Sequence, residues 1–123
     1  DVLDGILKEF ARLAHGSSVM CHFIDLSDHF AHMDSSITIY NFLRYSEKQW
    51  QRIDNDIQPQ NRLRWPDYLK LYSNLGIPQR EALVRAGDEQ ALATVLLCDA
   101  YENYSAPDLA ISHGYLISNF TSV

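Results

Sequence analysis

The chain has 123 residues, of which 46% are hydrophobic, and it carries a formal net charge of −6. A chain of this size fits one small domain, here residues 1–123, that can bury a real core. Its ten lysine and arginine residues are scattered, apart from Arg62 and Arg64, so no broad basic face is available for nucleic acid or an anionic membrane. No apolar run approaches the roughly 18 residues that span a bilayer, and no secretory signal pattern is visible. We therefore expect a cytoplasmic protein.

Two elements open the chain. Apolar residues between positions 3 and 14 follow the three-and-four spacing of an amphipathic helix, and Gly16 is placed to end it. From position 19 to 26 the apolar residues occupy both alternation phases, as a strand covered on both faces requires. We predict a helix followed by a central parallel strand. Cys21 and Cys98 each lie within an apolar stretch, which predicts two buried thiols.

The middle of the chain contains two further helix signals. Ser46 and Gln49 fit a capping box that opens a helix through Trp50. Residues 55–64 are polar and predict a loop. Pro66 then suits the first turn of a second helix, which the next glycine ends.

The last third of the chain predicts two strands around one helix. Residues 79–86 alternate weakly, as a strand does, and Asp88 can cap a helix that runs to Ala100. Residues 109–120 are rich in strand-forming types, with Gly114 as a bulge or a point of close approach. The predicted order is α-β-α-α-β-α-β.

Three strands make an incomplete sheet for a chain that contains a central parallel strand. Such a strand needs helices on both faces, which this chain can hardly supply. The chain also begins at Asp1 rather than at a methionine, and it begins inside a helical pattern. We expect a piece of a longer protein that associates with itself or pairs with a missing half through unpaired strand edges.

Histidines and aspartates crowd around the end of the first predicted strand. They are His22, Asp25, Asp28, His29, His32 and Asp34. Ligands of open α/β sheets bind beyond the carboxyl ends of the strands, and a histidine beside a carboxylate can accept a substrate proton. Asp25 and His29 are the candidate catalytic pair. The alternative is that Asp25 or Asp28 caps the turn and His29 lies at a rim.

The same histidines could in principle bind zinc or iron. The spacing of His22, His29 and His32 matches no compact motif, so we predict no metal site. His22 is then a hydrogen-bonded core histidine. A metal-dependent hydrolase centred on the three histidines is kept as an alternative.

Arginines beside aromatic residues form the second polar concentration. Arg44 follows Asn41, while Arg62 and Arg64 follow Asn61. Such arginines can clamp an anionic group or tie loops together through backbone carbonyls. We favour the structural role for Arg44 and for one of Arg62 and Arg64.

Four stretches resemble the carboxyl-terminal half of class I S-adenosylmethionine-dependent methyltransferases. They are the opening helix with His15-Gly-Ser and the strand ending Phe-Ile-Asp25; Asp28-His-Phe-Ala-His32-Met-Asp34 through Asn41-Phe-Leu-Arg-Tyr-Ser46 and Trp50; Gln60-Asn-Arg-Leu-Arg-Trp-Pro-Asp-Tyr68 with Leu-Gly76; and Asp108-Leu-Ala through Gly114-Tyr-Leu-Ile. The resemblance covers nearly the whole chain.

The resemblance implies an incomplete Rossmann-like α/β sheet holding strands five to seven with flanking helices, the last strand being antiparallel. It implies S-adenosylmethionine as the cofactor and a small-molecule methyl acceptor as the partner. His29 and Asp25 would then be catalytic. The wall of the acceptor pocket would comprise Asp28, His32, Asn41, Asn61, Arg62 and Arg64.

The family's cofactor-binding features are not matched. The glycine-rich loop after strand one and the acidic residue after strand two have no counterpart, and Ser17 and Ser18 replace two glycines of a family turn. We therefore assign no cofactor-binding residue to this chain and expect it to be inactive alone. A non-catalytic dimerisation or interaction module is the other alternative.

Overall fold

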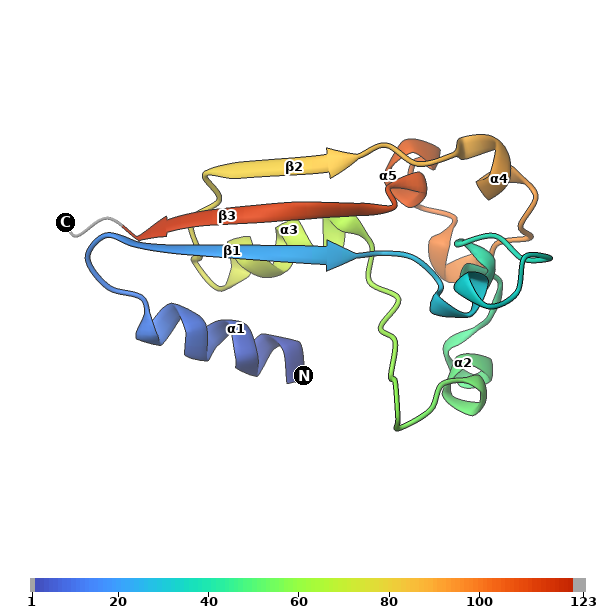
Figure 1. Cartoon of the computed structure of the whole chain (residues 1–123), viewed down its shortest axis with the longest axis horizontal. Helices are drawn as coiled ribbons and strands as arrows, with labels where there is room; N and C mark the ends of the chain where they lie inside the picture. Colours follow the sequence, from blue (N-terminus) through green and yellow to red (C-terminus); the bar gives the residue numbers. More distant parts are fainter. Residues whose placement is uncertain (1, 121–123) are drawn as a thin grey trace.

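The computed structural model describes residues 2–120, apart from the side chain of Glu81. Three strands form one sheet in the order β1-β3-β2. They are β1 (Ser18–Asp25), β2 (Glu81–Arg85) and β3 (His113–Phe120). Strand β3 lies between the other two and is antiparallel to both, so β1 and β2 run in the same direction (Figure 1). The chain is thus a small mixed α/β domain with an open sheet, and its last strand is antiparallel as predicted.

Within residues 2–120, five helices accompany the sheet. They are α1 (Val2–Leu13), α2 (Glu47–Ile53), α3 (Trp65–Asn74), α4 (Glu89–Ala93) and α5 (Ala106–Ala110). Three 3-10 turns cover His29–His32, Asn41–Arg44 and Asp99–Tyr101. Among the described residues, no helix has the length and apolar character needed to cross a bilayer.

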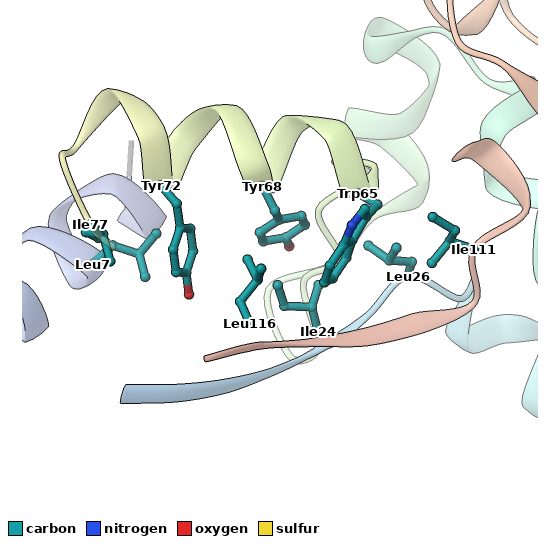
Figure 2. Packing of buried hydrophobic residues seen from close by; sticks show 9 residues of the cluster. All are labelled: Leu7, Ile24, Leu26, Trp65, Tyr68, Tyr72, Ile77, Ile111 and Leu116. Atoms are coloured by element: carbon teal, nitrogen blue, oxygen red, sulfur yellow. The ribbon is translucent and has the colours of Figure 1, made fainter. Parts of the chain in front are cut away.

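Helices α1 and α3 cover one face of the sheet. Trp65, Tyr68 and Tyr72 point from α3 toward Leu116 of β3, and Leu7 of α1 joins the same cluster (Figure 2). Each of these five side chains exposes 7% of its surface or less. Because full burial of one large apolar side chain contributes roughly 1.5–3 kcal/mol, this cluster holds both helices on the sheet.

The opposite face of the sheet is bare in the described part of the chain. The register places Phe23, Tyr115 and Leu83 side by side across the three strands, and they expose 55%, 42% and 56% of their surface. Strand β1 pairs with β3 alone and lies at the edge of the sheet. The prediction of a central parallel strand covered on both faces is therefore wrong for these residues. Cys21 lies on the bare face and is exposed, and Cys98 is half-buried, so the prediction of two buried thiols is wrong as well.

A second buried cluster lies beyond the carboxyl ends of β1 and β2, where α2, α4 and α5 gather (Figure 1). We call it the cap cluster; its buried members are Tyr40, Phe42, Leu43, Trp50, Leu92, Tyr101, Leu109 and Ala110. Tyr40 connects it to the sheet end, because its hydroxyl donates to Ala110 O at 2.8 Å and accepts from Asp88 N at 2.9 Å.

Local signals decided most helix boundaries. The capping box of Ser46 and Gln49 opens α2, and Pro66 lies in the first turn of α3, as predicted. The helix predicted from Asp88 to Ala100 instead ends at Ala93, because Cys98 N donates to Leu43 O and draws the following segment onto the cap cluster.

The start of the last strand also differs from the prediction. Residues 109 and 110 belong to α5, and β3 begins at His113. Ser105 caps α5 through a hydrogen bond from Asp108 N, and Pro107 lies in its first turn. These helix-start signals outweigh the strand preference of Leu109.

Candidate functional site

The candidate site begins at Asp25, the last residue of β1. The chain then passes through buried Leu26, whose N–H donates to Ser112 O at 2.9 Å, and enters a 3-10 turn at His29–His32. Gln60 holds this turn from the far loop, because its Oε1 accepts from His29 N at 2.8 Å. The turn thereby presents two histidines beside the carboxyl end of the strand.

Asp25, Ser27, His29 and His32 form one group of polar side chains in mutual contact, which we call the histidine surface. Asp25 Oδ1 accepts from Ser27 N at 2.9 Å and from Ser27 Oγ at 2.7 Å, while Asp25 Oδ2 lies 3.5 Å from His29 Nε2. Ser27 Oγ is 3.2 Å from His32 Nε2. Gln58 Nε2 lies 3.2 Å from His29 Nδ1 on the other side of that ring. The predicted pairing of Asp25 with His29 is thus present in the structure.

The environment of Asp25 favours its charged form. Burial raises the pKa of this carboxyl, but the hydrogen bonds from Ser27 and the nearby His29 and His32 outweigh burial, so the pKa is lowered. Asp25 is therefore ionised at neutral pH.

Asp28 has a different environment, although it is only three residues away. It exposes 1% of its surface, and its carboxylate caps the 3-10 turn by accepting from Phe30 N at 2.9 Å. Burial raises the pKa of Asp28, and hydrogen bonds with Phe30, Asn41 and Phe42 offset part of that rise. The alternative that Asp28 caps the turn is confirmed, and its side chain belongs to the interior.

Arg64 is fully buried, with 0% of its surface exposed. Its guanidinium donates to Leu26 O and Leu109 O, both at 2.8 Å, and to Ile111 O at 3.2 Å. Burial lowers the pKa of Arg64. The assignment of Arg64 to a substrate pocket is therefore wrong, because the side chain joins the end of β1 to the segment before β3.

Arg62 also ties backbone segments together. Its Nη1 donates to Phe42 O at 3.0 Å and to Tyr45 O at 2.5 Å, and its Nη2 donates to Glu47 at 2.9 Å. The guanidinium carbon lies 5.2 Å from the centre of the Trp50 ring. Sequence reasoning favoured a structural role for one of Arg62 and Arg64, and both have that role.

The two asparagines lie in different cavities. Asn61 exchanges hydrogen bonds of 3.1 and 3.2 Å with the Tyr68 hydroxyl and lines an open cleft of about 570 Å³ together with Arg62. Asn41 lines another cavity, of about 390 Å³, with Asp28. The predicted pocket residues therefore do not form one wall.

His22 points away from the histidine surface. Its Nδ1 is hydrogen-bonded to the Tyr72 hydroxyl on the covered face of the sheet, as the core-histidine interpretation predicts. Within residues 2–120, no group of three or more His, Cys, Asp or Glu side chains is arranged to hold a metal ion. The three-histidine hydrolase alternative therefore receives no support from the geometry.

Sequence reasoning missed Ser27, Gln58 and Gln60. Ser27 had a local signal, because a serine two residues after an aspartate commonly forms a side-chain turn. Gln58 and Gln60 had none, since they reach the histidine surface from about thirty residues further along the chain.

Comparisons with models of protein families, with curated proteins and with solved structures find no match for this chain.

Proposed function

We propose that this chain is the acceptor-side half of an S-adenosylmethionine-dependent methyltransferase whose full-length form transfers a methyl group to a small molecule. The observation that carries the proposal is the pairing of Asp25 and His29 at the carboxyl end of β1. The sequence resemblance supplies the class of reaction. The antiparallel last strand and the parallel directions of β1 and β2 are compatible with a mostly parallel Rossmann-like sheet that continues beyond this chain.

The chemistry assigned to these residues is proton removal from the acceptor. In the arrangement seen here His29 Nε2 faces Asp25 and Nδ1 faces Gln58. Displacement of the exposed Gln58 side chain would free Nδ1 to take a proton from an acceptor hydroxyl or amine. Asp25 would then stabilise the resulting imidazolium through Nε2–H. A positioned base of this kind contributes typically 10²–10⁴-fold to a rate.

The described residues do not fit the cofactor. Nucleotide-binding loops need closely spaced glycines near a helix amino terminus. The two glycines with positive φ, Gly16 and Gly76, instead follow the carboxyl ends of α1 and α3. We therefore place cofactor binding in the rest of the parent protein, and no reaction step is assigned to the cofactor here.

Two measurements test the proposal. The sequence of the source protein should contain an upstream glycine-rich strand-turn-helix, and its absence would remove the proposal.

In the full-length parent, His29→Ala should lower kcat by about 10²-fold or more while the melting temperature changes little, because the ring lies at the surface. His15→Ala, which removes a histidine at the opposite end of β1, is the matched control. Equal turnover of wild type and His29→Ala would show that His29 is a bystander.

A non-catalytic interaction module is the second candidate, favoured by the bare sheet face and the unpaired outer edge of β1 among the described residues. Calorimetry of the full-length parent with S-adenosylmethionine and sedimentation of the same sample separate the two candidates. Clear binding of S-adenosylmethionine by the full-length parent would contradict the interaction-module proposal. Dimerisation of the full-length parent without methyltransferase activity would favour it.

A further inference from the structure

An open cavity of about 260 Å³ lies between α1, β1 and α3. Leu3, Ile6, Leu7 and Phe10 of α1 form one wall. The floor is the stretch of β1 from His22 to Asp25, and Tyr68 and Tyr72 of α3 form the other wall. The lining is thus mostly aliphatic and aromatic, with a small number of polar groups, which is the composition of small-molecule sites.

The polar group inside this cavity is the hydrogen-bonded pair of His22 and Tyr72. Burial lowers the pKa of His22, so its ring is neutral at pH 7. Burial also raises the pKa of Tyr72 to about 12, so its hydroxyl keeps its proton. The pair is therefore uncharged, although it lies in an apolar wall.

One nitrogen of this pair is available to a ligand. Tyr72 and His22 share a hydrogen bond through Nδ1, and within the described residues Nε2 of His22 has no hydrogen-bond partner. When the Tyr72 hydroxyl donates to Nδ1, Nε2 carries the proton and becomes a donor. The ring is held in place by Phe10 and Tyr72, whose centroids lie 5.5 and 6.1 Å from its own. A ligand atom that accepts a hydrogen bond is the complement of this group.

The charge of the lining restricts the class of ligand further. Among the described residues that line the cavity, Asp25 is the charged one, and it lies where the cavity meets the histidine surface. An anionic ligand would be repelled by this carboxylate and would meet no compensating cation. An uncharged ligand meets neither penalty.

We propose that the cavity between α1, β1 and α3 binds a small uncharged aromatic molecule bearing one oxygen that accepts a hydrogen bond from His22. A dry apolar cavity of about 150 Å³ is enough for benzene, so the larger open volume here suits a substituted ring. This inference stands without the proposed methyl transfer, because it concerns binding alone.

The test is an NMR titration of the 123-residue chain with three probes that share a methyl-substituted benzene ring and differ in the para substituent. The probes are p-cresol, toluene and 4-methylbenzoate. We expect p-cresol to shift the amide signals of residues 6, 7, 10, 22 and 72 and to saturate. Toluene should bind about fivefold to tenfold more weakly, since it lacks one hydrogen bond. 4-Methylbenzoate should bind most weakly because of Asp25. Binding of the benzoate as tight as that of p-cresol, or no saturable shift, would overturn the proposal.

Two variants locate the binding. His22→Phe should reduce p-cresol affinity to that of toluene and leave toluene unchanged. Ile6→Trp should fill the mouth of the cavity and abolish binding of both; Ile6 is 46% exposed, so the larger ring does not enter the core. The matched control is Ile57→Trp, at a position 96% exposed in the distant loop. Unchanged p-cresol binding by Ile6→Trp would overturn the proposal. If either variant fails to fold, the ranking of the three probe affinities on the wild-type chain tests the proposal by itself.

Discussion

Two regions of the molecule are rich in polar groups: the segment with Arg62 and Arg64, and the histidine surface. They differ in how far these groups are buried and hydrogen-bonded. The two guanidinium groups are buried, and their terminal nitrogens are used on backbone carbonyls and Glu47. Asp25 and His29 are partly exposed, with 41% and 34% of their side-chain surface accessible, and their contact is loose. A polar side chain stabilises the fold when its donors are paired with acceptors inside the protein. A polar side chain at the surface, with loose contacts, remains available to a ligand.

The largest test of this comparison is Arg64→Met. The change keeps an unbranched, flexible side chain but removes the guanidinium, and so leaves the carbonyls of Leu26, Leu109 and Ile111 without their donor. An unpaired buried acceptor costs about 1–3 kcal/mol, so we expect the free energy of unfolding to fall by about 3–5 kcal/mol or the chain not to fold. Urea denaturation measures this. Arg52→Met, at the exposed end of α2, is the control and should change stability by less than about 0.5 kcal/mol. Similar midpoints for both variants would contradict the structural role of Arg64.

A smaller change in the free energy of unfolding is expected at Gly114, which packs against Trp65, the neighbour of Arg64 in the chain. A Cβ at this position would lie 2.5 Å from Trp65 Cζ3 and 2.9 Å from Leu83 O. Gly114→Ala should therefore cost about 1–3 kcal/mol through overpacking. Gly5→Ala is the matched control, since its Cβ would meet no atom within 4 Å. That change lies within α1 and should stabilise the chain by about 0.5–1 kcal/mol. The reverse order of the two variants in thermal unfolding would show that the sheet is not closely packed at Gly114.

The features that could be predicted from the sequence are those that depend on residues close together in the chain. Ser46 with Gln49 predicted the start of α2, and the prediction that Gly114 is a point of close approach is confirmed. In the site, Asp25 and His29 are four residues apart, and the turn between them brings their side chains together.

The features that sequence reasoning missed depend on long-range contacts. The carbonyl partners of Arg64 come from both sides of the fold, at residues 26, 109 and 111, so no local pattern could show that the side chain is consumed. The apolar residues of β1 in both phases predicted two covered faces, but the coverage depends on neighbours that the strand's own sequence does not specify. For the same physical reason, Gln58 could not be assigned to the His29 ring.

The most delicate test compares Asp25 with Asp28, which lie on the two sides of the boundary between surface and interior. The folded state lowers the pKa of Asp25, so Asp25 contributes stability that is present above its unfolded pKa and lost as the pH falls through its folded pKa. The folded state raises the pKa of Asp28, so it takes up a proton at higher pH than the unfolded chain, and acidification stabilises the fold through this group.

The two asparagine variants should therefore diverge in acid. Between pH 5 and 3, the advantage of the wild type over Asp25→Asn should shrink, because the wild type loses the stabilising charge that the variant never had. Over the same interval the wild type should gain stability relative to Asp28→Asn, whose amide oxygen can still accept from Phe30 N but cannot be protonated. Urea titrations at several pH values give both differences. Parallel pH profiles for the two variants would show that the two carboxyls share one environment. The proposed site depends on the distinction between the histidine surface and the buried turn, and that distinction would then be lost.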